Sequence, residues 1–99
     1  MDWNEEKSFE SDVLIEEEVD SSDPAQLVVY NDDYNTFDWV IQCFVEVLNH
    51  TVEQSEQLSL MIHFKGKAIV KTGQFEKLKK WRRQLVDRGL NAVVELIPS

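Results

Sequence analysis

The feature that most constrains the fold is an apolar stripe along residues 37–48. Apolar residues recur there at helical spacing, and a stripe of this width is typical of a helix that packs one face against a core. Asn35 or Thr36 can cap its first turn, where the negative charge of Asp38 is electrostatically favourable. We therefore expect a helix here, and it is the clearest element of the chain. The stripe consists of Phe37, Val40, Ile41, Phe44, Val45 and Leu48.

Two further helices and three strands are expected around this helix. Residues 51–54 have the form of a capping box that starts a second helix, and Gly66 ends that helix. A third helix is expected to end near Gly89, which suits a left-handed C-terminal cap. The apolar positions of the second helix include Val52, Leu58, Met61 and Ile62. The expected order is strand 27–30, helix 37–48, helix 52–64, strand 67–71, helix 75–86 and strand 92–96.

The order β-α-α-β-α-β predicts an α+β fold, with a three-stranded antiparallel sheet packed on three helices. With only three strands, a single sheet covered by helices on one face is the economical arrangement. A length of 99 residues suits one small domain with a single core. We expect this core domain to span residues 24–99, preceded by a disordered, flexible acidic arm at residues 1–23.

The formal charge of −9 supports this division of the chain. Residues 1–23 carry ten carboxylates and one lysine, whereas residues 24–99 carry nine acids and nine bases. Such an acidic arm cannot bury enough apolar surface to offset its ordering entropy. Within the domain, residues 31–57 carry only acidic charges and residues 65–88 carry mostly basic ones, which can orient charged partners. The acidic arm would repel phosphates, so we expect no nucleic-acid partner.

Several functional classes lack a signal in the sequence. Cys43 is the only cysteine, so it cannot form an internal disulfide, and its apolar surroundings place it in or near the core. No zinc-binding or nucleophile motif occurs in the sequence. We therefore expect the protein to bind no metal and no cofactor, and not to be an enzyme. No apolar run is long enough to cross a membrane, and there is no signal-like start. We expect a cytoplasmic protein that does not associate with membranes.

Two segments carry the candidate site. The first is Asn31-Asp32-Asp33, which lies between an apolar strand and a helix start and concentrates acceptors and negative charge. Loops held by rigid elements on both sides are common positions for binding residues. The second is the segment 61–67, Met-Ile-His-Phe-Lys-Gly-Lys, which contains His63. The first segment suits a cation that carries hydrogen-bond donors.

Taken together, these segments and the element order resemble the ClpS family from about Leu27 to Leu96. That family consists of small adaptors that hand proteins with destabilising N-terminal residues to an AAA+ Clp unfoldase. The resemblance implies binding of a bulky hydrophobic N-terminal residue, of the Leu, Phe, Tyr or Trp class. It also implies that the substrate is delivered for degradation through the N-terminal domain of the unfoldase.

The resemblance further implies roles for individual residues. Asn31, Asp32 and His63 would bind the substrate α-amino group, which is mostly cationic at neutral pH and carries three donors. Asp33 and Asn35 would orient the peptide backbone. Glu76 would contact the unfoldase, and the acidic arm would engage it during delivery. The hydrophobic pocket would be lined by Phe37, Val40, Ser59, Ile62 and Ala92.

The chain departs from the family at three places. Family members often carry Met at the positions of Phe37 and Ser59, so the pocket of this chain is expected to rank N-terminal residues differently. Trp81 stands where a Lys can occur, which is expected to alter the unfoldase contact. The alternative function is a generic α+β protein-interaction domain without N-terminal recognition, in which the Asn-Asp-Asp turn is purely structural.

Overall fold

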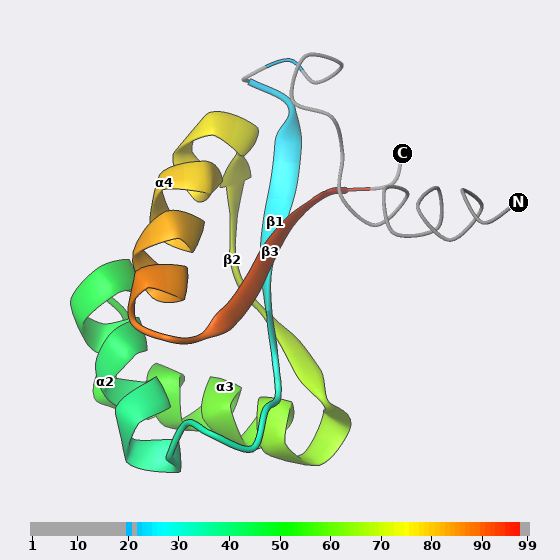
Figure 1. Cartoon of the computed structure of the whole chain (residues 1–99). Coiled ribbons are helices and arrows are strands. Elements are labelled where there is room, and N and C mark those ends of the chain that lie inside the picture. The colour runs from blue at the N-terminus through cyan, green and yellow to red at the C-terminus, as the bar shows by residue number, and fades with distance from the viewer. Residues whose placement is uncertain (1–19, 21, 98–99) are drawn as a thin grey trace, which may run out of the picture.

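The computed structural model describes residue 20 and residues 22–97. Figure 1 shows one antiparallel sheet with its helices on one side. The elements are β1 (Pro24–Tyr30), α2 (Phe37–Leu48), α3 (Val52–Lys65), β2 (Lys67–Gln74), α4 (Phe75–Asp87) and β3 (Asn91–Leu96). The predicted order β-α-α-β-α-β is therefore confirmed. The acidic arm expected at residues 1–23 lies outside the described residues, apart from positions 20, 22 and 23.

The first two helices begin and end where their sequence signals indicate. Thr36 is the N-cap of α2 and accepts a hydrogen bond from the Trp39 N–H, which decides between the two candidate caps. Thr51 caps α3 in the same way through the Gln54 N–H. Gly66 ends α3 in the left-handed region, with φ of 93°. Capping side chains and left-handed ends satisfy backbone groups that a helix leaves unpaired, so these boundaries follow from local chemistry.

β1 is the central strand of the sheet, and the strand order is β2-β1-β3. It pairs antiparallel with both neighbours, along its full length with β2 and from Ala25 to Tyr30 with β3. The pairing with β2 shifts register between Leu27 and Val28, so that Val70 has no direct partner. The carbonyl of Val70 accepts a hydrogen bond of 2.7 Å from His50 Nε2. A bulge of this kind increases the local twist of a strand pair.

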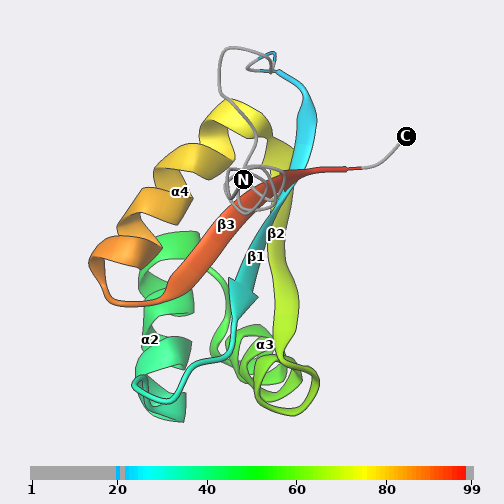
Figure 2. The same cartoon turned by 45° about the vertical axis from the view of Figure 1, so that its right-hand side comes forward.

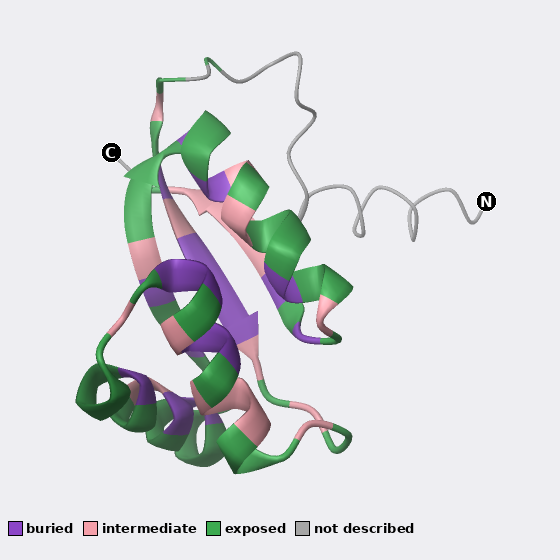
Figure 3. Ribbon diagram, turned by 90° about the vertical axis from the view of Figure 1, so that its left-hand side faces the viewer, coloured by how far each residue is buried: buried purple, intermediate pink, exposed green. Residues whose placement is uncertain are grey.

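The core lies between the sheet and the helices, as Figures 2 and 3 show. Leu27, Phe44, Leu48, Leu78 and Leu85 are almost fully buried there. Cys43 is also completely buried, as its apolar surroundings predict. Within the described residues, no helix is long and apolar enough to span a bilayer.

The residues that α3 buries are not the ones that its apolar pattern predicts. Val52 and Met61 are 56% and 41% exposed, whereas Ser55 and Ser59 are 0% and 3% exposed and share the inner face with Ile62. α3 packs on α2 and β2, and small side chains allow the close approach of a helix. Packing therefore overrides hydrophobicity in setting the orientation of α3. This arrangement places Ser59 at the functional site described next.

Candidate functional site

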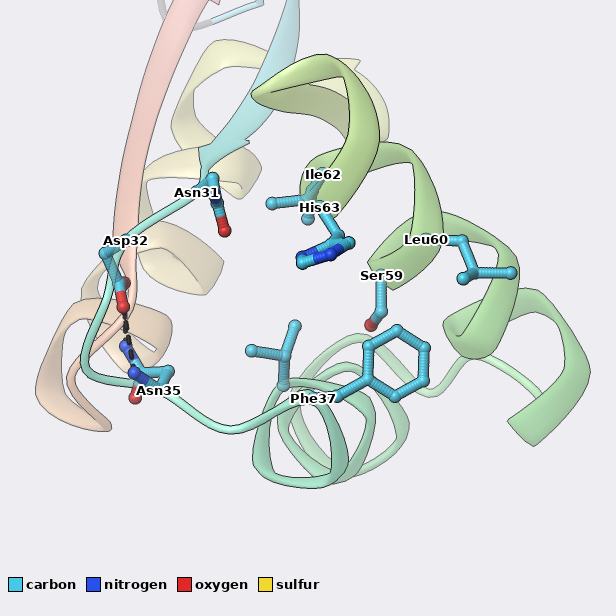
Figure 4. Close-up of a pocket in the computed structure, with 9 residues that line it drawn as sticks. Asn31, Asp32, Asn35, Phe37, Ser59, Leu60, Ile62 and His63 are labelled. Atoms are coloured by element: carbon cyan, nitrogen blue, oxygen red, sulfur yellow. Dashed lines mark hydrogen bonds between the residues drawn. The ribbon is translucent and has the colours of Figure 1, made fainter.

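A cavity of about 440 Å³ lies between the loop that follows β1, the start of α2 and the second half of α3. Figure 4 shows the side chains around it. A volume of this size is in the range of small-molecule and side-chain binding pockets. The lining residues are Asn31, Asp32, Asn35, Phe37, Val40, Ser59, Leu60, Ile62 and His63. Eight of these nine residues were predicted from the sequence, and the loop and helix segments do lie together.

Asn31 and His63 come together because the loop is tied to the end of α3. The backbone N–H of Asn31 donates a hydrogen bond of 2.9 Å to the carbonyl of Gly66. His63 lies in the last turn of α3, just before Gly66, and is exposed. In Figure 4 the Asn31 side chain and the His63 ring face the same space. The left-handed turn at Gly66 therefore brings an amide and an imidazole to one rim of the cavity.

The Asp32 carboxylate organises the loop around itself. Its Oδ1 accepts hydrogen bonds of 2.8 Å from the backbone N–H groups of Tyr34 and Asn35. Its Oδ2 accepts a third bond of 2.8 Å from Asn35 Nδ2. A carboxylate has about four lone-pair positions, so one remains for an incoming donor. Asp32 is thus both a structural centre of the loop and a free anionic acceptor.

Hydrogen bonding keeps this carboxylate ionised. Burial raises the pKa of the Asp32 carboxyl, but the hydrogen bonds from Asn35 and from the Tyr34 backbone outweigh burial and hold the pKa below its ordinary value of 3.8. Hydrogen bonds donated to a carboxylate stabilise its charged form. The cavity rim therefore carries a negative charge at neutral pH, which suits a cationic ligand.

The loop is also anchored to the turn between α4 and β3. Asn35 Nδ2 donates a second bond, of 2.9 Å, to the carbonyl of Gly89. Trp39 Nε1, from the first turn of α2, donates a bond of 3.0 Å to the carbonyl of Arg88. Arg88 in turn forms an ion pair with Glu46 of α2. Three side-chain contacts thus fix the loop and α2 against this turn.

The opposite wall of the cavity is apolar. Phe37 and Val40 come from α2, and Leu60 and Ile62 come from α3. Phe37 is 41% exposed and Leu60 is 38% exposed, so both form the open rim, whereas Ile62 is 5% exposed and belongs to the inner wall. A pocket with an anionic, acceptor-rich rim and an apolar wall can bind a cation that carries a hydrophobic group.

Three predicted site residues lie away from this cavity. Asp33 is exposed on the loop and does not line the cavity. Ala92 is 2% exposed in β3, where it pairs with Val29, and it is also absent from the lining. Glu76 lies in the first turn of α4 and forms an ion pair of 3.6 Å with Lys79. That turn lies at the end of the domain opposite the β1–α2 loop (Figure 1).

Sequence reasoning missed Leu60 and Trp39. Leu60 precedes His63 by three positions, so helical spacing alone would have placed it on the same side of α3 as His63. Trp39 gave no comparable signal, because its indole contacts a backbone carbonyl 49 residues away. Within the described part of the chain, no group of three or more His, Cys, Asp or Glu residues could hold a metal ion.

Comparisons with known proteins agree with this geometry. The family model described as ATP-dependent Clp protease adaptor protein ClpS matches residues 20–93. The ClpS adapter protein of Thermosynechococcus vestitus is 35% identical over 66 residues, which are 66% of this chain and 70% of that protein. The protein of the same description from Nitratidesulfovibrio vulgaris is 34% identical over 58 residues, which are 59% of this chain and 56% of that protein.

The fold has a counterpart among solved structures. The structure of Agrobacterium tumefaciens ClpS2 bound to L-phenylalaninamide superposes with a TM-score of 0.74 at 17% sequence identity. The superposition covers 77% of this chain and 99% of that one. At this identity the likeness concerns the fold. The family match covers three quarters of the sequence and confirms the resemblance that the loop and helix segments indicate. Because this family consists of adaptors, the prediction of a protein that is not an enzyme is confirmed as well. The chain belongs to the ClpS family of adaptors of the ATP-dependent Clp protease.

Proposed function

We propose that this chain binds the free N-terminal residue of substrate proteins and delivers those proteins to an AAA+ Clp unfoldase for degradation. The single observation that carries the proposal is the cavity, in which an anionic loop and an apolar wall face one another. The N-terminal residues that suit it are bulky and hydrophobic, of the Leu, Phe, Tyr and Trp class. The N-terminal residue of a protein is the one position where a cationic amine and a side chain share a carbon atom.

The acceptor side of the cavity suits the α-amino group. At neutral pH that group is mostly protonated, because its reference pKa is about 8, and it then carries three donors. Asp32 supplies charge and a remaining lone pair, the Asn31 amide supplies a carbonyl oxygen, and an unprotonated ring nitrogen of His63 supplies a third acceptor. In this proposal each of the three residues accepts a hydrogen bond from one N–H group of the amine.

The apolar side of the cavity suits the first side chain. Burying a Leu or Phe side chain contributes about 1.5–3 kcal/mol. Each hydrogen bond to a charged group adds about 1.5–3 kcal/mol. After the cost of association is subtracted, these terms correspond to a micromolar complex. An affinity in that range suits an adaptor, which must release its substrate to the unfoldase.

The ligand of the Agrobacterium tumefaciens ClpS2 structure supports this assignment. L-phenylalaninamide has a free α-amino group, a phenyl side chain and an amide in place of the next peptide bond. The first two features correspond to the anionic rim and the apolar wall of the cavity in the present chain. We extend the assignment to Asp33 and Asn35 as residues that orient the peptide backbone. Because Asn35 Nδ2 already has two acceptors, its contribution would come from its carbonyl oxygen.

Delivery requires a second surface. We place the contact with the N-terminal domain of the unfoldase at Glu76, because this side chain is exposed in the first turn of α4 and lies far from the cavity. A partner could then bind there while the cavity remains occupied. We also assign the acidic arm at residues 1–23 to the engagement of the unfoldase, and we place the protein in the cytoplasm.

The experiment that tests recognition uses peptides that differ only at their N-terminus. A fluorescent peptide with N-terminal Leu or Phe should bind the protein with micromolar affinity, and its N-acetylated form should not, because acetylation removes the positive charge and a donor. The variant Asp32→Ala should also lose binding while circular dichroism shows retained helix and strand content. Equal binding of free and acetylated peptides would instead indicate a general interaction domain.

A degradation assay tests delivery separately. The variant Glu76→Lys should bind the Leu peptide with wild-type affinity and slow the degradation of a Leu-initiated reporter by a Clp unfoldase and its protease. Loss of peptide binding in this variant would show that Glu76 acts on the cavity. Degradation at the wild-type rate would place the unfoldase contact elsewhere.

A further inference from the structure

Ser59 presents a buried hydroxyl group without a partner at the wall of the cavity. The residue is 3% exposed, and its Oγ has no hydrogen-bond partner among the described residues. Buried polar atoms are almost always paired in folded proteins, so an exception requires an explanation. Ser59 also lines the cavity, whose other α3 residues are Leu60, Ile62 and His63. An unsatisfied donor and acceptor therefore lies beside the space that we assign to the first side chain.

Ser55 provides an internal comparison. It lies one helical turn before Ser59, is 0% exposed, and its Oγ is also unpaired among the described residues. Ser55 does not line the cavity. Two serines at this spacing allow α3 to pack closely on its neighbours, and that role is sufficient for Ser55. Close packing does not explain why Ser59 also lines the cavity that we assign to the ligand.

We propose that Ser59 makes this cavity selective for an N-terminal tyrosine over an N-terminal phenylalanine, through a hydrogen bond between Ser59 Oγ and the phenolic hydroxyl. This inference rests on the proposed function, because it names the preferred substrate of the same site. A phenol can both donate and accept, so it can pair with a serine hydroxyl in either direction. Phenylalanine has the same shape without the hydroxyl.

The spacing along α3 supports this pairing. Ser59 and His63 are four residues apart on one face of the helix, so their backbones are separated by about 6 Å along the axis. His63 is assigned to the α-amino end of the ligand, and the ring of an aromatic residue extends away from that end by a similar length. A phenolic hydroxyl at the tip of the ring is therefore brought to the level of Ser59.

Phe37 is the neighbour of Ser59 that an aromatic guest side chain would displace. Figure 4 shows the Phe37 ring beside the Ser59 side chain. Phe37 is 41% exposed in the first turn of α2, so its ring can change rotamer without disturbing the core. A guest ring that displaces it would gain an aromatic neighbour as well as contact with Ser59. Entry of an aromatic side chain is thus compatible with the packing around the hydroxyl.

The energetic balance favours tyrosine. Because Ser59 Oγ is already removed from water in the free protein, binding does not have to dehydrate it again. The ligand loses the hydration of its own hydroxyl and gains one protein hydrogen bond. A neutral hydrogen bond of this kind corresponds to a preference of about five- to tenfold in affinity. A Phe ligand leaves Ser59 unpaired, as it is in the free protein.

The test measures the affinity ratio of two peptides that differ only in having Tyr or Phe as the first residue. The wild-type protein should bind the Tyr peptide about five- to tenfold more tightly. In Ser59→Ala the ratio should fall to about one or below, because the phenol then enters an apolar wall. Ser55→Ala, which removes a buried hydroxyl from the same helix face outside the cavity, should keep the wild-type ratio. Circular dichroism and thermal midpoints of both variants check that α3 is intact.

The outcomes separate this inference from the proposed function. If the wild-type protein binds both peptides equally, or if Ser59→Ala keeps the wild-type ratio, the role of Ser59 is overturned while N-terminal recognition stands. If Ser55→Ala lowers the ratio as much as Ser59→Ala, the effect comes from the packing of α3 and the inference is also overturned. If neither peptide binds in its free-amine form, the proposed function fails, and this inference fails with it.

Discussion

Asn35 Nδ2 donates a hydrogen bond of 2.9 Å to the carbonyl oxygen of Gly89, which lies 54 positions further along the chain. The same nitrogen donates to Asp32 Oδ2 at 2.8 Å. One side-chain amide therefore joins the anionic rim of the cavity to the turn between α4 and β3. A rim that is fixed before a ligand arrives loses less conformational freedom on binding, which increases affinity.

Replacing this amide should weaken binding, because it loosens the loop and also removes the carbonyl oxygen that we assign to the peptide backbone. In Asn35→Ala both hydrogen bonds are lost, and we expect an affinity for Leu-initiated peptides about three- to tenfold lower, measured by fluorescence anisotropy. The control is Gln74→Ala, since Gln74 is an exposed amide that makes no side-chain cap to α4 and lies at the other end of the domain. Equal affinities in Asn35→Ala and the wild-type protein would contradict the anchoring role.

The stability contribution of Asp32 should depend on pH in a defined direction. Its pKa is lower in the folded protein than its ordinary value of 3.8. A carboxyl group with a depressed pKa stabilises the folded state above its ordinary pKa, and this contribution is lost as the pH falls through the lower, folded-state value. Asp32→Asn should therefore unfold at a lower urea concentration than the wild-type protein at about pH 7, and this difference should shrink as the pH falls below the ordinary value of 3.8.

Asp33→Asn is the matched control for this experiment. It neutralises the neighbouring exposed carboxylate and leaves the three hydrogen bonds to Asp32 in place. A difference between Asp32→Asn and the wild-type protein that stayed constant across the pH range would show that charge is not its cause.

The hydrogen bond from Trp39 to Arg88 should contribute to stability. In Trp39→Phe the ring remains apolar, but the donor to the Arg88 carbonyl is removed. We expect the free energy of unfolding to fall by about 1 kcal/mol, as measured by urea denaturation. Trp39 is partly buried against the core, so part of any larger loss would come from the smaller ring. An unchanged free energy of unfolding would mean that water replaces the indole without cost.

Leu60 should act as part of the apolar rim. In Leu60→Asp a charge replaces a lining residue, and we expect binding of Leu- and Phe-initiated peptides to fall more than tenfold, because the ligand side chain would then be buried beside a carboxylate. Val52→Asp is the control, since Val52 is also an exposed apolar residue of α3, 56% exposed, but does not line the cavity. Similar losses in the two variants would point to a general effect of charge on α3.

The sequence predicts the fold well because its signals are local. The apolar stripe of α2, the capping residues Thr36 and Thr51 and the left-handed turn at Gly66 each act within a few residues, and all agree with one arrangement. The ends of strands depend on partners instead. β1 begins at Pro24 and β2 continues to Gln74 because these two residues pair with each other across the sheet. Nothing local to either segment indicates that extension.

The site was predicted less completely than the fold. Asn31, Asp32 and His63 belong to segments with a recognisable pattern, and they do line one cavity. The anchoring of Asn35 and Trp39 to a distant turn depends on tertiary structure and leaves no periodic signal. The orientation of α3 was also not predictable from hydrophobicity, because its buried face carries Ser55 and Ser59 while Val52 and Met61 face outward.

The central position of β1 has a consequence for how the cavity opens. Asn31 follows a strand whose backbone is hydrogen-bonded on both sides, so separating the base of the loop requires two ladders to break together. α3 packs mainly on α2 and on the edge strand β2. Local opening in proteins follows the cooperative unit that is easiest to detach. The amide hydrogens of β1 should therefore exchange only near the global unfolding limit, whereas α3 can open locally. In the proposed site, Asn31 would then be held more rigidly than the side chains that α3 contributes.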